Sequence, residues 1–254
     1  MMEQTSGTYS GIGALVSQNA ETGIITVVKA FADAPAAKAG VKNGDIIYKV
    51  KGKEVTGVDI NNVVTEMKGE KGTTVDITVY RESEKKYIDF TITRDQVNEP
   101  TVEYKMLDKK KKIGYIQISQ FEEVTYDQFT KALDDLKKQG MKAVIFDVRS
   151  NPGGLYETVC KMLDEILPEG NLVSTKDKYG NEEKQTSDSK CLDMPMVVLQ
   201  NKDSASASEI FAGAIQDFNA GKIVGTQSFG KGIVQTILPL SDGSAVKLTV
   251  QDYY

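Results

Sequence analysis

Apolar and polar residues follow two different rhythms along the chain, and the rhythm changes near residue 98. Before that point, short β-branched or alternating runs indicate half-buried strands. These strands are expected over residues 12–17, 24–29, 45–50, 75–80 and 87–92. Helices are expected over residues 34–40, which Gly40 ends, and over residues 59–67, which Asp59 can cap. Closely spaced strands with two helices predict a small, partly open β-barrel.

Beyond residue 98, strand patterns alternate with helical ones. Helices are expected over residues 125–140, 155–167 and 206–219, and strands over residues 113–118, 142–148, 196–200 and 222–225. Residues 142–148 form a continuous apolar run, which is typical of a strand buried in a parallel sheet. Residues 173–187 are expected to form a hairpin about Gly180 and Asn181. The alternation of strands and helices predicts an α/β layered domain.

The bulk composition excludes several functional classes. A chain of 254 residues can form two ordinary domains, and a formal net charge of −5 argues against a general nucleic-acid binder. The basic run Lys109–Lys112 is expected to be a solvated turn. No run of 18 apolar residues occurs, and the first residues lack the apolar core of a signal peptide. With no histidine and only Cys160 and Cys191 as cysteines, neither a zinc site nor any other cofactor is expected, and Cys160 is predicted to pack in the core.

The absence of histidine draws attention to a serine cluster that a glycine-flanked lysine follows. A serine hydrolase usually takes the hydroxyl proton with histidine, so Lys231 is the best placed base here. Ser206 opens a predicted helix, whose N-terminus can stabilise negative charge, although Ser206 to Glu209 also fits a helix-capping box. Lys231 lies among small and apolar residues, which suits a base, although a surface lysine with a buried stem explains it equally well. Gln235, on the same face of a predicted strand, could orient the amine.

Two glycine-containing turns offer further candidate sites. Residues 225–231 match the start of a phosphate-binding loop, but Gly232 replaces its Ser/Thr and a strand pattern follows where that loop requires a helix. Nucleotide binding is therefore disfavoured. In the turn of residues 151–154, the two glycines let backbone N–H groups approach a ligand closely. Together with the Ala207 amide they could form an oxyanion hole, or they could serve only as a tight strand–helix turn.

Three segments taken together resemble the C-terminal processing peptidases, or tail-specific proteases, which are serine–lysine endopeptidases with a PDZ domain. The segments are DVRSNPGGL, NKDSASASEIFAGAIQD and VGTQSFGKGIVQ. The resemblance implies a ClpP- or crotonase-like protease core over residues 98–254, with Ser206 as nucleophile, Lys231 as general base and Gln235 as its support. It also implies oxyanion donors from Ala207 and from Gly153 or Gly154. Asp217 matches an acidic position of the family.

The first part of the chain, residues 8–97, resembles the PDZ domain of the same family. The segment YSGIG matches the carboxylate-binding loop, and APAAKAGVKNGDIIYKVKG matches the core signature. The resemblance implies that Gly11, Ile12 and Gly13 bind a peptide's terminal carboxylate, and a glycine-rich loop can do so with free N–H groups. Arg81, after the last strand but one, is a candidate for coupling ligand binding to activation, unless it is a plain surface arginine.

The resemblance also implies partners and a location. Substrates are expected to be proteins or peptides with free, non-polar C-termini, outside the cytoplasm, with no nucleic acid involved. A longer parent protein would carry an export signal or membrane anchor and could form homo-oligomers, and the family continues beyond a pair like Tyr253-Tyr254, so the chain is expected to be a fragment. The alternative function is a peptide-binding adaptor, in which a PDZ domain stands on a catalytically inactive protease-like domain.

Overall fold

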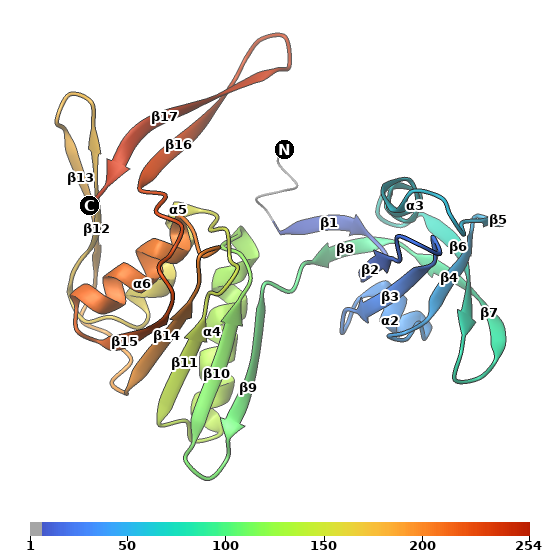
Figure 1. The fold of residues 1–254 in the computed structure, drawn as a ribbon, viewed down its shortest axis with the longest axis horizontal. Helices are drawn as coiled ribbons and strands as arrows, with labels where there is room; N and C mark the ends of the chain where they lie inside the picture. The colour runs from blue at the N-terminus through green and yellow to red at the C-terminus, as the bar shows by residue number, and fades with distance from the viewer. Residues whose placement is uncertain (1–6) are drawn as a thin grey trace. The chain divides into compact units, whose positions relative to one another are not determined.

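The structure, a computed structural model, describes residues 7–254. Part of the N-terminal stretch that lacks the core of a signal peptide therefore lies outside the described residues. The described chain divides into two compact units, Gly7–Glu99 and Pro100–Tyr254, each with its own hydrophobic core (Figure 1).

The first unit is an antiparallel sheet with two short helices. Its strand order is β2-β3-β4-β6-β7, with β5 paired to β4, while β1 and β8 form a separate pair. The strands are β1 Thr8–Gly11, β2 Ala14–Gln18, β3 Ile25–Ala30, β4 Ile46–Val50, β5 Lys53–Glu54, β6 Thr74–Arg81, β7 Lys86–Thr93 and β8 Asp95–Asn98. The helices are α2 Pro35–Ala39 and α3 Ile60–Met67. β2 ends the sheet, so one side of its backbone faces no other strand of this unit.

Local sequence signals explain where these helices begin and end. Asp59 accepts the Asn61 N–H at 2.8 Å, which is the predicted N-cap of α3. The helix then buries Val63 and Met67 in the core of the unit. α2 ends at Gly40, whose φ of 100° favours glycine. The predicted small β-rich domain with two helices is confirmed. The strands β1, β5 and β8 were not predicted, because such short runs show no period.

The second unit is built on a five-stranded sheet of order β15-β14-β11-β10-β9. Its strands are β9 Val102–Asp108, β10 Ile113–Ile118, β11 Ala143–Asp147, β14 Met196–Gln200 and β15 Gly221–Gly225. Four of them are parallel, and β9 is an antiparallel edge strand. The connecting helices are α4 Glu123–Lys138, α5 Tyr156–Asp164 and α6 Ala207–Asp217, and α5 packs against both α4 and α6. The predicted α/β layered domain is confirmed.

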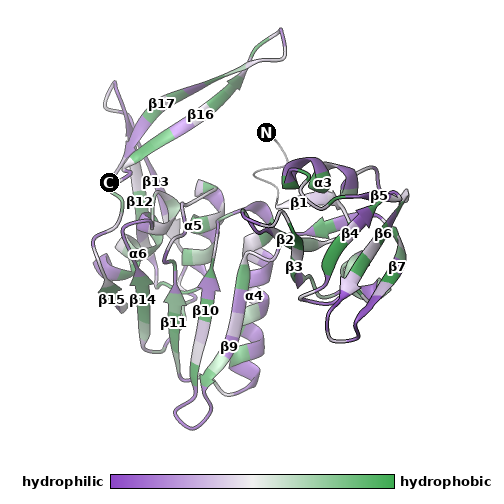
Figure 2. Ribbon diagram, turned by 45° about the vertical axis from the view of Figure 1, so that its right-hand side comes forward, coloured by the Kyte–Doolittle hydropathy of each residue, from purple (hydrophilic) through white to green (hydrophobic). Residues whose placement is uncertain are grey.

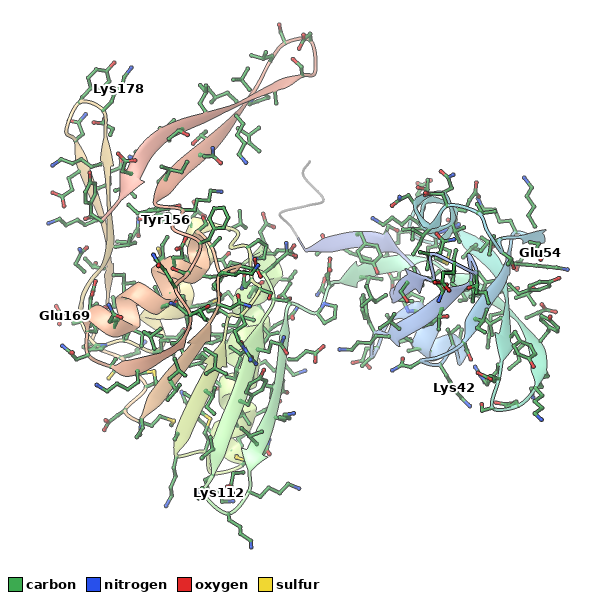
Figure 3. The ribbon with its side chains drawn as sticks, viewed as in Figure 1. Lys42, Glu54, Lys112, Tyr156, Glu169 and Lys178 are labelled. Atoms are coloured by element: carbon green, nitrogen blue, oxygen red, sulfur yellow. The ribbon has the colours of Figure 1, made fainter. Side chains whose placement is uncertain are left out.

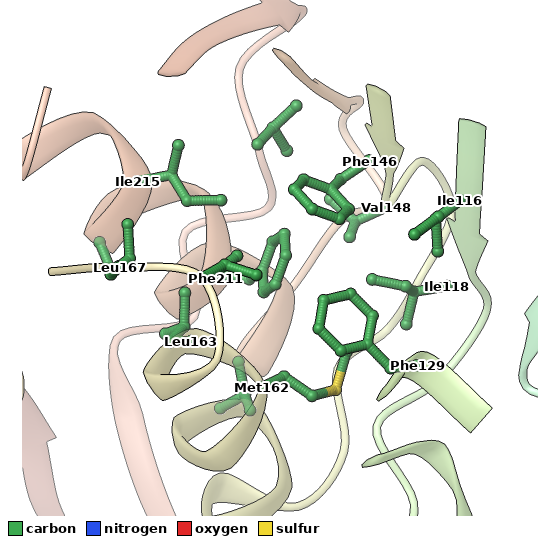
Figure 4. Close-up of a cluster of buried hydrophobic side chains, with 14 of the residues drawn as sticks. Ile116, Ile118, Phe129, Phe146, Val148, Met162, Leu163, Leu167, Phe211 and Ile215 are labelled. Carbon is green, nitrogen blue, oxygen red and sulfur yellow. The ribbon is translucent and has the colours of Figure 1, made fainter. Parts of the chain in front are cut away.

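Phenylalanine side chains fill the space between this sheet and its helices (Figure 4). Phe129 of α4, Phe146 of β11 and Phe211 of α6 are fully buried. The Phe211 ring lies edge-on to the other two, with centroid distances of 5.4 Å to Phe146 and 6.4 Å to Phe129. Full burial of a side chain of this size contributes about 1.5–3 kcal/mol. This packing fixes the position of α6, at whose start Ser206 lies.

Strand β11 is less completely buried than its sequence predicts. Val144 and Phe146 are buried, but Ala143 and Ile145 between them are only half-buried. The alternation arises because the helices bury one face of the sheet more fully than the other. The central strands β11 and β14 nevertheless remain the most apolar part of the sheet in Figure 2. The continuous apolar run thus correctly predicted a parallel central strand but overestimated its burial.

A second sheet of order β13-β12-β17-β16 completes this unit. Its strands are β12 Gly170–Asp177, β13 Glu182–Ser187, β16 Ile233–Pro239 and β17 Ala245–Tyr253. The predicted hairpin about Gly180 and Asn181 is confirmed as the β12–β13 turn, and a strand does follow Lys231. β9 and β17 were not predicted. The β16–β17 hairpin extends away from the five-stranded sheet in Figure 1 and exposes Ile237, Leu238 and Leu248.

Smaller predictions on single side chains are also confirmed. Cys160 is buried in the main core, and burial raises the pKa of its thiol to about 12. Cys191 is exposed and forms no disulfide. Lys109, Lys110 and Lys111 are exposed in the turn between β9 and β10. The basic run is therefore a solvated turn, and Cys160 contributes packing.

Candidate active site

Ser206 lies on a strained turn between strand β14 and helix α6. Its φ of 57° and ψ of −117° fall in a region that residues with a side chain rarely occupy. The preceding loop is held by the Ser204 hydroxyl, which donates to the Val148 carbonyl at 2.7 Å, and by the Ala205 N–H, which donates to the Asn151 carbonyl at 3.0 Å. A strained strand-to-helix turn of this kind carries the nucleophilic serine in α/β-hydrolases.

The capping interpretation of Ser206 also holds in the structure. The Ser206 N–H donates to the Glu209 carboxylate at 2.8 Å, as a capping box requires. This contact engages the backbone of Ser206 and does not occupy its hydroxyl. Capping and a catalytic role of the hydroxyl are therefore compatible.

The glycine turn of residues 151–154 lies directly against Ser206. A side chain at Gly153, whose φ is 104°, would place its Cβ 2.8 Å from the Ser206 Cβ and 3.0 Å from the Ala207 nitrogen. The Gly153 N–H already donates to the Asn151 side chain at 2.8 Å. Among the described residues, no partner accepts a hydrogen bond from the Gly154 N–H. Of the two predicted donors in this turn, Gly154 is thus the one that remains available.

A loop over residues 226–232 brings Lys231 to the same place. The Phe229 N–H donates to the Ser204 carbonyl at 3.0 Å, and the Lys231 N–H donates to Glu209 at 2.8 Å. The Lys231 side chain is half-buried. Within the described part of the chain, no hydrogen bond joins its amine to the Ser206 hydroxyl. Strand β16, and not a helix, follows this loop, which confirms that it is not a phosphate-binding loop.

Two cavities meet at Ser206 and Lys231, and both residues line both cavities. The smaller one has a volume of about 320 Å³, and its apolar wall comes from α6 and β12: Leu172, Val173, Ile210, Gly213 and Ala214. A Cβ at Gly213 would meet no atom within 4 Å, so this helical glycine leaves the pocket wide. The larger cavity, of about 770 Å³, extends along α5 and the base of the β16–β17 hairpin. A peptide could therefore cross Ser206 with one side chain in the smaller pocket.

The other two predicted residues lie at the edges of these cavities. Gln235 lines the larger cavity with Lys231, but its amide nitrogen lies 3.5 Å from the Thr249 hydroxyl of the neighbouring strand. A β-bulge between Val234 and Gln235 interrupts the pairing at this point. Asp217 is exposed at the last residue of α6, where it lines the smaller pocket. Among the described residues, neither this carboxamide nor this carboxylate forms a hydrogen bond or an ion pair with Ser206 or Lys231.

Tyr253, at the end of β17, lines both cavities together with Ser206. Its ring stacks on Tyr156 of α5, with centroids 5.9 Å apart and an interplanar angle of 16°. In Figure 3, Tyr156 lies beneath the base of the β16–β17 hairpin. Burial raises the pKa of Tyr253, and a side-chain hydrogen bond with Ser206 offsets part of this rise. The phenol is thus protonated at neutral pH.

A separate groove in the first unit lies between edge strand β2 and helix α3. It has a volume of about 300 Å³, and its walls are largely apolar: Ile12, Ala14, Val16, Phe31, Ile60, Val64 and Met67. Gly13 lies at one end with a φ of 75°, and a side chain there would place its Cβ 2.3 Å from the Ala34 Cβ. Because β2 is an edge strand, a peptide could add to it as a further strand.

The predicted carboxylate-binding loop lies at the end of this groove. Ile12 is buried in the core, and its carbonyl accepts the Ala36 N–H at 2.7 Å, while the Gly13 carbonyl accepts the Phe31 N–H at 3.0 Å. These bonds turn the carbonyls into the protein. Lys68, just beyond α3, has its amine 4.9 Å from the centre of the Tyr9 ring and also lines the groove. The groove therefore has a cation beside the glycine loop.

Arg81 is not a surface residue. It is buried at the end of β6, where it donates two hydrogen bonds of 2.8 Å to the Asp45 carboxylate and one of 2.8 Å to the Gly40 carbonyl. The Arg81 guanidinium also pairs with the Glu84 carboxylate at 3.1 Å. A buried arginine needs such partners to offset its loss of hydration. These contacts tie α2 to the sheet inside one unit, and the coupling role of Arg81 stays a prediction.

Several residues of these sites were not identified from the sequence. Glu209 was identified only as a cap, Tyr253 only as part of a pair near the end of the chain, Asn151 only as the first residue of the glycine turn, and Lys68 not at all. The position of Lys68 directly after an amphipathic helix could have indicated a groove residue. No sequence signal reveals that Glu209 contacts the loop of Lys231 or that Tyr253 lines the same cavities as Ser206.

Neither a metal site nor a membrane span is found in the described part of the chain. No group of three or more Cys, Asp or Glu side chains within residues 7–254 could hold a metal ion. No helix in that range is long and apolar enough to cross a membrane.

The two units and the site around Ser206 define a peptidase fold joined to a peptide-binding domain. The chain belongs to peptidase family S41, whose model matches residues 112–254, and a PDZ domain model matches residues 10–92. The predicted family and fold class are confirmed.

Relatives extend the similarity over the whole chain. A carboxy-terminal-processing protease of Bartonella bacilliformis is 39% identical over 262 residues, which cover 100% of this chain and 59% of that protein. A probable CtpA-like serine protease of Staphylococcus epidermidis is 38% identical and covers 97% of this chain and 50% of its own length. The solved photosystem II D1 C-terminal processing protease is 30% identical with a TM-score of 0.56, covering 98% of this chain and 68% of that one. The chain thus spans about half the length of the curated relatives it matches.

Proposed function

We propose that this chain provides the substrate-capturing and catalytic parts of a serine endopeptidase that cleaves proteins near their C-termini. Residues 8–97 would capture the free C-terminus, and residues 98–254 would cut the chain. The observation that supports this most is the convergence on one pair of cavities of Ser206, on its strained turn, and Lys231. Membership of family S41 and the names of the relatives support the same function.

The catalytic cycle follows from the groups around Ser206. The unprotonated Lys231 amine takes the Ser206 hydroxyl proton as the serine oxygen attacks the peptide carbonyl carbon. The Gly154 and Ala207 N–H groups stabilise the negative oxygen of the tetrahedral intermediate. The C–N bond then breaks as the lysine passes its proton to the leaving amine, and an acyl-enzyme remains. Water then attacks the ester carbonyl carbon and gives a proton to the Lys231 amine. As the ester bond breaks, Lys231 passes a proton to the Ser206 oxygen, and the cleaved peptide leaves.

Two residues have supporting roles in this cycle. Gln235 lines the larger cavity with Lys231, and a small rotation away from Thr249 would let its carboxamide orient the amine. Tyr253 makes room beside Ser206 when substrate enters, because both groups line the cavity that the peptide must occupy. The smaller pocket accepts the side chain before the scissile bond, and its apolar wall selects a non-polar one.

Capture of the substrate uses the groove between β2 and α3. The tail of the substrate adds as a strand to the free edge of β2, and apolar side chains enter the groove. The terminal carboxylate binds the backbone of Gly11, Ile12 and Gly13, with Lys68 as a nearby cation. Substrates outside the cytoplasm, a membrane anchor and a homo-oligomer in the whole protein belong to the same proposal, and they rest on the family resemblance.

The function is tested with two peptides that differ only at their C-terminus. A peptide with a non-polar tail and a free carboxylate should be cleaved with a kcat/KM roughly 10–100 times higher than that of its C-terminal amide. The reason is that the amide removes the charge that the glycine loop and Lys68 recognise. Chromatography with mass spectrometry measures both rates. Equal cleavage of the two peptides would refute C-terminal capture, and cleavage of neither would refute the proteolytic function.

A further inference from the structure

Glu209 has more hydrogen-bond contacts than a helix cap requires. One carboxylate oxygen accepts the N–H groups of Ser206 and Lys231, each at 2.8 Å, and the other accepts the Gly230 N–H at 2.6 Å. A capping box accounts only for the bond to Ser206, which belongs to the same helix terminus. The other two donors, the N–H groups of Gly230 and Lys231, belong to the loop of residues 226–232.

These contacts connect the two segments on which the proposed chemistry depends. Ser206 has a backbone conformation that is strained for a residue with a side chain, and its N–H points at Glu209. Lys231 lies in a loop of irregular backbone, and its own N–H meets the same oxygen. A single carboxylate thus fixes the main chain at both positions. Moving either segment would break a hydrogen bond to a charged acceptor, which is stronger than a bond between neutral groups.

The ionised form of Glu209 is the one that fits this arrangement. All three contacts are N–H donors to the carboxylate, which can accept about four hydrogen bonds. Burial raises the pKa of Glu209, but the hydrogen bonds from Ser228, Gly230, Lys231 and Ser206 outweigh it, so the pKa lies below its usual value. The group stays charged at neutral pH. It has no proton to give, so it does not act as an acid in the reaction.

We propose that Glu209 is a positioning residue, which holds the backbone of the nucleophile Ser206 and that of the base Lys231 in fixed relation through one shared carboxylate. This inference rests on the proposed function for its catalytic consequence. The carboxylate oxygen that accepts the N–H of the strained Ser206 also accepts the N–H of Lys231. The carboxylate therefore affects the chemical step through the backbone of these two residues.

Glu209→Gln tests this with almost no change of shape. The amide keeps one acceptor oxygen but presents an NH₂ donor to an N–H group, so at least one of the backbone contacts is lost. We expect kcat for peptide cleavage to fall by roughly tenfold or more, since this loss converts to an energy typical of a hydrogen bond to a charged group. KM should change by less than about twofold, because the apolar wall of the smaller pocket and the β2–α3 groove keep all of their side chains. Glu209→Asp, which keeps both oxygens, should recover part of kcat.

Glu165→Gln is the matched control for a merely structural effect. Glu165 lies at the end of α5, and its carboxylate accepts a hydrogen bond of 2.6 Å from the Tyr126 hydroxyl. Its replacement removes the charge from a carboxylate of the same unit that accepts a hydrogen bond, while the amide oxygen can still accept the Tyr126 hydroxyl, so kcat should stay unchanged. A kcat in Glu209→Gln equal to that of Glu165→Gln would overturn the proposal.

Hydrogen exchange separates this proposal from the proposed function. The amides of Gly230 and Lys231 should exchange faster in Glu209→Gln than in the unchanged protein, and the amides of the β2–α3 unit should not change. This readout needs no turnover. If the unchanged protein cleaves no peptide, the proposed function fails, and faster exchange of these two amides still supports the positioning contact. Unchanged exchange of both amides would refute it whatever the activity.

Discussion

Ser206→Ala is expected to lower peptide cleavage by roughly 10⁴-fold or more while leaving capture of the peptide's C-terminus unchanged. The substitution removes only the oxygen that attacks the carbonyl carbon. The turn keeps the bond between the residue 206 N–H and the Glu209 carboxylate, because alanine retains this N–H. Chromatography of a non-polar peptide measures cleavage, and calorimetric titration of the same peptide measures binding.

Ser119→Ala serves as the control for this result. The Ser119 hydroxyl donates to the Thr101 carbonyl at 3.2 Å, outside both cavities. This variant should cleave at the normal rate. A Ser206→Ala protein that cleaves as fast as Ser119→Ala would show that the nucleophile is another group, and it would remove the basis of the proposed mechanism.

Lys231→Met is expected to slow cleavage by roughly 10²–10⁴-fold, the range that a general base typically contributes. Methionine keeps an unbranched apolar side chain but has no amine to accept the Ser206 proton. The loop should keep its position, because the contact to Glu209 comes from the Lys231 backbone. The loss should appear in kcat, measured by steady-state kinetics on the same peptide.

Lys202→Met removes a lysine from the loop before α6 without touching either cavity. Its side chain is 82% exposed and pairs with Asp203 at 2.9 Å. Exposed pairs of this kind contribute little to stability, so this variant should behave like the unchanged protein. If Lys231→Met and Lys202→Met cleave equally fast, a group other than Lys231 takes the proton.

Much of the fold could be predicted because its signals are local. Asp59 caps α3 through its neighbour Asn61, and Gly40 ends α2 with a backbone angle that favours glycine. The apolar run around Phe146 indicated a central parallel strand, since such strands are apolar on both faces. β17 was missed although it alternates, because its apolar residues Val246, Leu248 and Val250 are exposed and gave no clear core face.

The candidate site could be predicted only in part, because some of its contacts join segments that are distant in the sequence. Ser206 and Lys231 stand in recognisable sequence surroundings, and the structure brings them to one pair of cavities. The positive φ of Ser206 and the bonds from Glu209 to both Ser206 and Lys231 could not be predicted, because they depend on segments that come together only in the folded protein. Arg81 was misjudged because its partner Asp45 is distant in sequence, and a lone arginine after a strand is usually exposed.

The most direct test of the account is to locate the covalent adduct that a serine-reactive fluorophosphonate forms with the protein. Mass spectrometry of the digested protein should find one adduct, on the peptide that carries Ser206. The adduct should form far more slowly in Lys231→Met, because the hydroxyl then lacks its base. An adduct on a different residue, or equal rates with and without the lysine amine, would contradict a nucleophilic Ser206 activated by Lys231.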